Sequence, residues 1–155
     1  MKVQAKRALS LLLALVMLLG LTANAAQVST QLDQTARYIH TVVTAPQVGA
    51  VGGEWAVLGL ARSGYALPDS YYTAYYKTVE DTVKNKNGVL HSKKYTEYSR
   101  VVLALTAIGK DPRDVAGYDL TLPLGDYDKT LWQGVNGPIW ALIALDAGDE
   151  KYNDR

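Results

Sequence analysis

Apolar positions along the chain follow helical spacing, and one helix-sized pattern occurs three times. Each copy has a bulky start, an aliphatic and alanine-rich run and a closing glycine: EWAVLGLARSG, EYSRVVLALTAIG and GPIWALIALDAG. Leu60, Leu105 and Leu145 take equivalent places in the three copies. The regular, long period between them is typical of helix-pair repeats, which bury their apolar faces by stacking on neighbours. The pattern therefore predicts an all-α fold of stacked helix hairpins, with repeats centred on residues 54–64, 97–109 and 137–148.

The stretches around these copies predict further helices of a more amphipathic kind. They run from about Thr30 to Thr44, from Pro68 and Asp69 to about Lys86, and from about Leu122 to Gln133. In the second of them, four residues are expected to form one apolar stripe: Tyr72, Tyr76, Val79 and Val83. The glycine-rich loop 47–53 lacks a phosphate-binding spacing and no lysine follows it, which favours a structural turn. Mostly apolar helices paired with amphipathic ones indicate two helical layers.

The N-terminal segment 1–25 has the features of a secretory signal peptide. Lys2, Lys6 and Arg7 precede an apolar run over positions 8–21, and Ala23-Asn24-Ala25 forms a small-residue cleavage site. The apolar run is shorter than the roughly 20 residues that a membrane-spanning helix needs. We therefore predict cleavage after Ala25, a secreted or cell-surface protein that meets the membrane only through this peptide, and a domain over residues 26–155.

Charge and composition narrow the partners of that domain. Removing Lys2, Lys6 and Arg7 with the signal peptide leaves 13 basic against 15 acidic side chains, a net charge of −2, which argues against a nucleic-acid partner. The chain has no cysteine, which excludes zinc sites with thiolate ligands. His40 and His91 are not in ligand spacing and are expected to be ordinary surface or half-buried side chains. We expect neither a metal nor a cofactor.

The alternating helices, the regular repeat period and segments such as SRVVLALTAIGKDP and QGVNGPIWALIALD resemble secreted bacterial α/α-toroid proteins. The resemblance is to their prenyltransferase and squalene-cyclase type (terpenoid cyclase-like) repeats, and it covers positions 30–149 of the chain. It implies inner and outer helices around a central cavity. The chain supplies about three copies and so corresponds to part of a toroid, which further repeats in a longer chain would complete.

Catalytic residues of such enzymes are not evident here. The resemblance implies an acidic motif of the form Asp-x-Asp-Asp-Thr in cyclases, and its nearest match is the segment from Asp126 to Thr130, where Lys129 replaces the last aspartate. A lysine beside Asp128 keeps that carboxylate ionised and weakens it as an acid, so Asp126 and Asp128 are only weak catalytic candidates. Glutamate and aspartate pairs suited to glycosidase chemistry have no distinctive spacing.

Polar and aromatic residues gather at the starts of the three similar helices and form the preferred candidate binding wall. They are Glu54, Trp55, Glu97, Tyr98, Arg100, Asn136 and Trp140. Two interpretations stay open for them: a ligand site, or a Glu97–Arg100 surface pair with ordinary core aromatics. A tyrosine ladder at positions 71, 72, 75 and 76 could stack on sugars, but half of it must pack between helices. The sequence thus favours a domain that binds a small molecule, a glycan or a surface protein; a terpenoid cyclase-like or carbohydrate-active enzyme is the alternative, and a scaffold spacer is a third interpretation.

Overall fold

The computed structural model describes residues 27–148; its regular structure is helical, with no β-strand in that range. A helix over residues 27–42 comes first. It is followed by α2 (Glu54–Ser63), α3 (Asp69–Asn85), α4 (Thr96–Ala107), the 3₁₀ turn η1 (Leu122–Gly125), α5 (Tyr127–Thr130), the 3₁₀ turn η2 (Leu131–Gln133) and α6 (Asn136–Asp146). The predicted all-α class is confirmed. The signal peptide predicted for residues 1–25 lies outside the described residues.

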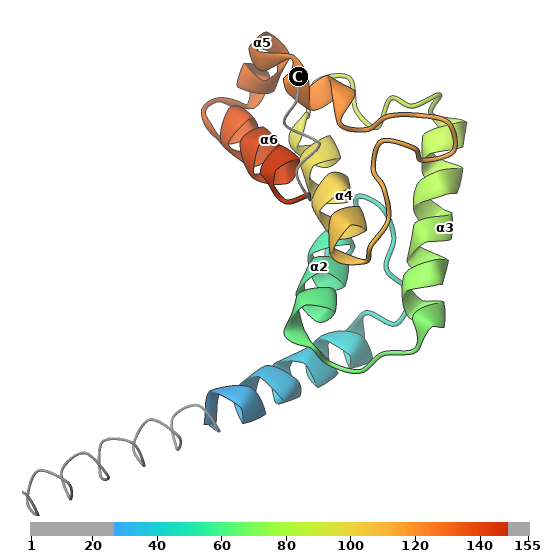
Figure 1. The fold of residues 1–155 in the computed structure, drawn as a ribbon, viewed down its shortest axis with the longest axis vertical. Coiled ribbons are helices and arrows are strands. Elements are labelled where there is room, and N and C mark those ends of the chain that lie inside the picture. Colours follow the sequence, from blue (N-terminus) through green and yellow to red (C-terminus); the bar gives the residue numbers. More distant parts are fainter. Residues whose placement is uncertain (1–26, 149–155) are drawn as a thin grey trace, which may run out of the picture.

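Helix α4 is the centre of the packing. It contacts α2 on one side and α6 on the other, so the three helices with similar sequences lie next to one another in chain order (Figure 1). Seven of its 12 residues are buried. The longer α3 stands apart from these three helices in Figure 1 and contributes Tyr75, Val79 and Val83 to the same core. The core therefore lies between a row of mostly apolar helices and one amphipathic helix.

The buried stripe of α3 differs from the predicted one by one residue in its first half. Tyr71, Tyr75, Val79 and Val83 are buried, whereas Tyr72 and Tyr76 are only half-buried. A constant four-position step places Tyr71 and Tyr75 in line with the two valines. The Tyr71 hydroxyl donates a hydrogen bond to the Val43 carbonyl at 2.8 Å, which fixes this side of the helix inward.

The single helix predicted for residues 122–133 is divided into three short pieces. Asp126 leaves the helical region with φ −84° and ψ 89°, and its carboxylate accepts a hydrogen bond from the Lys129 N–H. An aspartate that captures a nearby backbone N–H competes with helix continuation and starts a new helix instead. This stretch is therefore an irregular cap over the start of α6.

The helix over residues 27–42 extends away from the rest of the molecule (Figure 1). Within residues 27–42 only Ala36 is buried, and it packs in a small cluster with Leu60 and Tyr71. None of the helices within residues 27–148 combines the length and the apolarity needed to cross a bilayer.

The glycine-rich loop 47–53 is a structural turn, as the sequence predicts. Gly53 lies so close to the Gln47 carbonyl that a Cβ at this position would be 2.2 Å from that oxygen. Gly49 and Gly52 have positive φ angles of 75° and 79°, which side chains disfavour. The loop folds back over the start of α2, where the Gly49 N–H donates to the Glu54 carboxylate at 2.6 Å.

Candidate functional site

A cleft of about 290 Å³ lies at the starts of α2, α4 and α6. Its lining residues are Trp55, Thr96, Arg100, Gln133, Asn136 and Trp140. Four of them belong to the predicted binding wall: Trp55, Arg100, Asn136 and Trp140. Each comes from the first or second turn of its helix, so the packing of α2 and α6 on either side of α4 brings them together. We refer to these six lining residues as the tryptophan cleft.

Two indole rings form the apolar part of the tryptophan cleft. The centroids of Trp55 and Trp140 are 5.2 Å apart, and the rings are inclined at 60°. This separation and tilt are in the range that aromatic pairs prefer. Trp55 is 42% exposed, whereas Trp140 is half-buried and packs against the core. Trp140 therefore anchors the pair, and Trp55 offers ring surface to a ligand.

Three polar side chains complete the wall. Gln133 accepts a hydrogen bond from the backbone N–H of Thr96 at 2.9 Å, which satisfies an exposed donor at the start of α4. That bond uses the amide oxygen, so the Gln133 NH₂ group keeps its two donors for another partner. The Asn136 side chain is exposed and makes no hydrogen bond to any described residue. Thr96 and Gln133 are absent from the predicted wall, because they lie far apart in the sequence and the bond between them leaves no local signal.

Arg100 connects the cleft to a buried carboxylate. Its guanidinium forms a close ion pair with Glu97, and its Nε lies 4.0 Å from Glu54 Oε2. The Glu54 side chain is only 1% exposed, while that of Arg100 is 22% exposed. Two carboxylates thus face one guanidinium, so the positive charge of Arg100 is neutralised within the protein. The cleft has no unbalanced cation with which to attract an anionic ligand.

Under the cleft, several polar atoms are buried without a hydrogen-bond partner in the protein. Among the described residues, Glu54 Oε2, Arg100 Nε and the hydroxyls of Tyr75 and Ser99 accept or donate no hydrogen bond. Burial raises the pKa of Tyr75, and the negative charge of Glu54 raises it further, while Arg100 opposes the shift. The three side chains that interact here, Glu54, Tyr75 and Arg100, come from α2, α3 and α4, so this cluster joins the two layers below the tryptophan cleft.

The remaining residues of the predicted wall lie beside the cleft or away from it. Glu54 and Glu97 hold Arg100 from behind and do not line the cavity. Tyr98 is buried, and its hydroxyl accepts a hydrogen bond from the Leu90 N–H at 3.0 Å. It lines a different cavity, next to Tyr95 and Tyr118. Tyr98 therefore stabilises the segment after α3.

The weak catalytic candidates are placed on the surface. Asp126 binds the Lys129 ammonium at 2.7 Å, and this hydrogen bond holds the pKa of Asp126 below its usual value. Asp128 is exposed. An acid that protonates an alkene needs a poorly held proton in a shielded site, and a carboxylate kept ionised by a lysine has no such proton.

Within residues 27–148, no three histidine, aspartate or glutamate side chains group closely enough to hold a metal ion. His40 and His91 are both half-buried.

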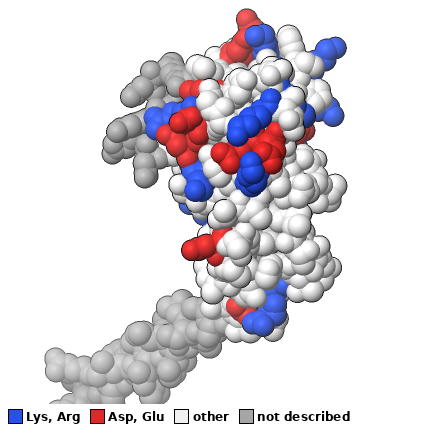
Figure 2. All heavy atoms as spheres, turned by 90° about the vertical axis from the view of Figure 1, so that its right-hand side faces the viewer, with Lys and Arg blue, Asp and Glu red and all other residues white. Residues whose placement is uncertain are grey.

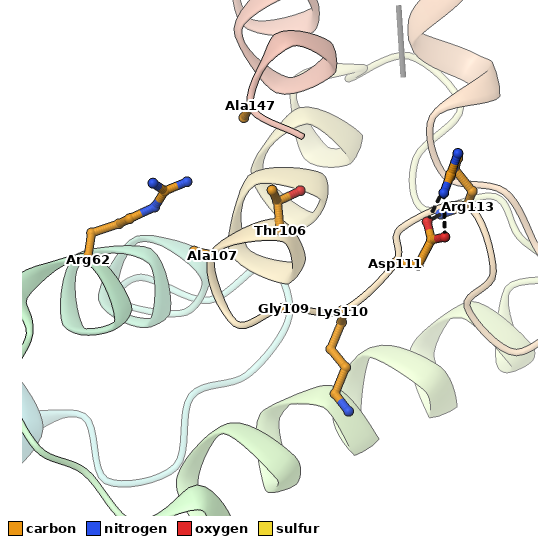
Figure 3. A pocket seen from close by; sticks show the side chains of 8 residues that line it. All are labelled: Arg62, Thr106, Ala107, Gly109, Lys110, Asp111, Arg113 and Ala147. Carbon is orange, nitrogen blue, oxygen red and sulfur yellow. Dashed lines mark hydrogen bonds and ion pairs between the residues drawn. The ribbon is translucent and has the colours of Figure 1, made fainter. Parts of the chain in front are cut away.

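A larger cavity of about 570 Å³ lies at the other end of the same helices (Figure 3). Its charged side chains do not converge. Arg113 pairs with Asp111 at 2.8 Å, and Lys110 lies over the ring of Tyr76, 4.9 Å from its centroid. In Figure 3, Arg62 and Lys110 point in different directions, Arg62 toward the side of Ala147 and Lys110 away from it. This cavity lacks a convergent polar set, so the tryptophan cleft is the better candidate.

Charged side chains elsewhere are mixed in sign. Figure 2 shows the molecule from the side on which α3 lies in Figure 1; the blue and red atoms lie next to one another there and leave no broad area of one sign. One such pair on α3 is Lys77 with Asp81, whose charged atoms are 2.8 Å apart.

Comparison with protein-family models, curated proteins and solved structures finds no match to this chain.

Proposed function

We propose that the chain is a secreted or surface-associated helical-repeat domain that binds a neutral, hydroxyl-rich ligand of the glycan class in the tryptophan cleft. The observation that carries this proposal is the meeting of Trp55 and Trp140 with the side chains of Arg100, Gln133 and Asn136. Indole rings offer flat apolar surface to the C–H face of a sugar ring. Amide and guanidinium groups donate hydrogen bonds in fixed directions to its hydroxyl groups.

The electrostatics favour a neutral ligand over a charged one. An anion would approach a guanidinium that already faces Glu97 and Glu54, and a cation would find no carboxylate in the cleft lining, because neither glutamate lines the cavity. The cleft volume of about 290 Å³ is at the lower end of the ~300–1,000 Å³ of small-molecule pockets. A ligand of one or two sugar rings matches this size, and a longer glycan would extend out past Trp55.

The wider architecture is part of the same proposal. Consecutive contacts of α2, α4 and α6, with α3 outside them, support an arrangement of inner and outer helices as in part of an α/α toroid of about three repeats. The signal-peptide features of segment 1–25 support secretion. The proposed relationship to terpenoid cyclase-like repeats concerns the fold only. No catalytic role is proposed, because Asp126 is held ionised by Lys129.

The experiment is a titration of the protein with a panel of neutral oligosaccharides built from glucose, galactose and N-acetylglucosamine. Sialylated and sulfated oligosaccharides and a quaternary ammonium compound serve as charged comparisons. Binding is followed by calorimetry and by tryptophan fluorescence. We expect at least one neutral oligosaccharide to bind and the charged compounds to bind no better than it.

Two matched variants assign the binding to the cleft. Trp55→Ala should weaken the affinity about tenfold or more, because a lost aromatic contact of about 1.4 kcal/mol has that effect. Trp132→Ala is the control, since Trp132 is 57% exposed but does not line the cleft. Preferred binding of the anionic compounds, or equal losses in the two variants, would contradict the proposal.

A further inference from the structure

The tryptophan cleft offers a ligand more hydrogen-bond donors than acceptors. Three of its six lining side chains, those of Trp55, Arg100 and Trp140, carry N–H donors and no acceptor. The other three lining side chains are a hydroxyl and two amides, each of which combines a donor with an acceptor oxygen. A ligand group that donates a hydrogen bond to the lining side chains must therefore use one of these three oxygens.

One of the three oxygens is already used by the protein. Gln133 Oε1 accepts the backbone N–H of Thr96 at 2.9 Å. A backbone N–H can bond only the oxygen of an amide, so this contact fixes the orientation of the Gln133 amide group. Gln133 is half-buried and lines the cleft, and its NH₂ group is the part of the amide that remains for a ligand. At this position the ligand must supply an acceptor.

A carbonyl oxygen meets that requirement better than a hydroxyl group does. It has two lone pairs and no hydrogen, so it needs no acceptor in return. A hydroxyl group that is shielded from water also needs a partner for its own hydrogen, and the cleft has few acceptors to offer. The carbonyl should belong to a neutral group, because Arg100 already faces the carboxylates of Glu54 and Glu97. An uncharged amide has this chemistry.

The two indole rings favour an apolar group beside the carbonyl. The Trp55 ring is 42% exposed and its centroid lies 5.2 Å from that of Trp140, so the cleft has flat apolar surface on this side. An acetamido group combines a methyl group that suits this surface with a carbonyl oxygen that suits Gln133. Its single N–H needs one acceptor, which the exposed side-chain amide of Asn136 can supply.

We propose that the ligand of the tryptophan cleft carries an acetamido group, as N-acetylhexosamines do, and that Gln133 is the residue that selects for this group. The inference rests on the proposed glycan-binding function and narrows it to N-acetylated sugars. The Gln133 NH₂ group donates to the acetamido carbonyl, and the methyl group packs on the exposed ring of Trp55. A sugar with a hydroxyl group in place of the acetamido group loses the methyl contact and gains a hydrogen that needs an acceptor.

The first test compares two disaccharides of the same linkage, N,N′-diacetylchitobiose and cellobiose, by calorimetry. They differ in carrying acetamido groups or hydroxyl groups at the same ring positions. We expect N,N′-diacetylchitobiose to bind at least about tenfold more tightly. Equal affinities, or tighter binding of cellobiose, would overturn the inference and leave the binding of neutral glycans in place. If neither disaccharide binds, the inference fails, and the proposed function fails with it only where every other neutral oligosaccharide of the panel is also inactive.

The second test assigns the selection to Gln133. Gln133→Glu keeps an oxygen to accept the Thr96 N–H and removes both NH₂ donors. A carboxylate at the start of α4 is favourable for the helix, so the variant should fold, which circular dichroism and the melting temperature verify. Its affinity for N,N′-diacetylchitobiose should fall about tenfold, and its affinity for cellobiose should change much less, so the preference is lost.

Gln34→Glu is the matched control, because Gln34 is exposed on the helix over residues 27–42 and does not line the cleft. It adds the same negative charge to the protein and should leave both affinities unchanged. A Gln133→Glu variant that retains the preference for the acetylated disaccharide would overturn the role of Gln133. Equal losses in the two variants would overturn it as well, since they would trace the effect to net charge.

Discussion

Replacing Arg100 with methionine tests the buried charge cluster that supports the tryptophan cleft. The Arg100 side chain is 22% exposed and its Nε lies 4.0 Å from Oε2 of Glu54, a carboxylate that is 1% exposed. Without the guanidinium, Glu54 keeps only the hydrogen bond from the Gly49 N–H at 2.6 Å. Glu97, which is 25% exposed, loses its cation at the same time.

The size of the effect follows from the burial of Glu54. Removing one partner of a fully buried ion pair costs about 3–5 kcal/mol. Arg100 is partly exposed and the contact to Glu54 is long, so we expect a loss of about 2–3 kcal/mol in the free energy of unfolding. For a domain of this size that corresponds to a fall in melting temperature of roughly 10 °C.

Urea denaturation and thermal melting at neutral pH measure this loss. Arg62→Met is the control, since Arg62 is exposed and forms no ion pair with a described residue. The double variant Glu54→Gln/Arg100→Met should be more stable than Arg100→Met alone. A loss below about 1 kcal/mol at neutral pH would refute the reasoning.

Two further predictions concern packing and titration. Gly137→Ala places a Cβ 1.8 Å from the Thr130 carbonyl oxygen and should lower the free energy of unfolding by about 2–3 kcal/mol, measured by urea denaturation. Gly59→Ala is the control: its Cβ has open space around it, so the substitution should stabilise α2 by about 0.5–1 kcal/mol. Equal effects of the two substitutions would exclude the clash. Burial raises the pKa of Tyr75 above its ordinary value and that of Tyr71 to about 12, so the fold favours the neutral phenols; this stability is present below about pH 10 and is lost as the pH rises through the folded-state values. Tyr75→Phe removes a buried hydroxyl that has no hydrogen-bond partner in the protein, so it should leave the free energy of unfolding unchanged or raise it by up to about 1 kcal/mol. The variant should also lose less melting temperature than the wild type above about pH 10. A clear destabilisation would contradict this and show that the hydroxyl makes a hydrogen bond.

The sequence predicts the helices that packing alone determines. The apolar run and closing glycine of α2 place its end correctly, and Gly64 takes the left-handed conformation with φ 73°. The repeat predicted at residues 97–109 corresponds to α4, which begins at Thr96 and ends at Ala107. These helices form because nearly every face of them is buried or partly buried, so the hydrophobic pattern and the structure carry the same information.

The errors occur where one local polar contact outweighs the pattern. Leu120, Leu124, Tyr127 and Leu131 have helical spacing, but Asp126 binds the Lys129 N–H and interrupts the helix. In α3, Tyr71 is turned inward by its hydrogen bond to the distant Val43 carbonyl, which the spacing of tyrosines does not encode.

In the candidate site, too, the residues on the repeated helices could be predicted and the residues joined by a long-range bond could not. The shared polarity of helix starts predicts that Trp55, Arg100, Asn136 and Trp140 meet, whereas Thr96 and Gln133 join them through a single long-range bond.

The glycine-rich loop 47–53 explains why a carboxylate can be buried beneath the cleft. A loop rich in glycine at the start of a helix offers backbone N–H groups and the positive end of the helix, an arrangement that often receives an external anion. Here the Gly49 N–H donates to Glu54, in the first turn of α2, so the anion is the protein's own side chain. Arg100 from α4 balances that charge. Trp55, on the rim of the cleft, directly follows Glu54 in the chain. Glu54 therefore positions the rim of the cleft by fixing the loop, α2 and α4 to one another, without itself lining the cavity.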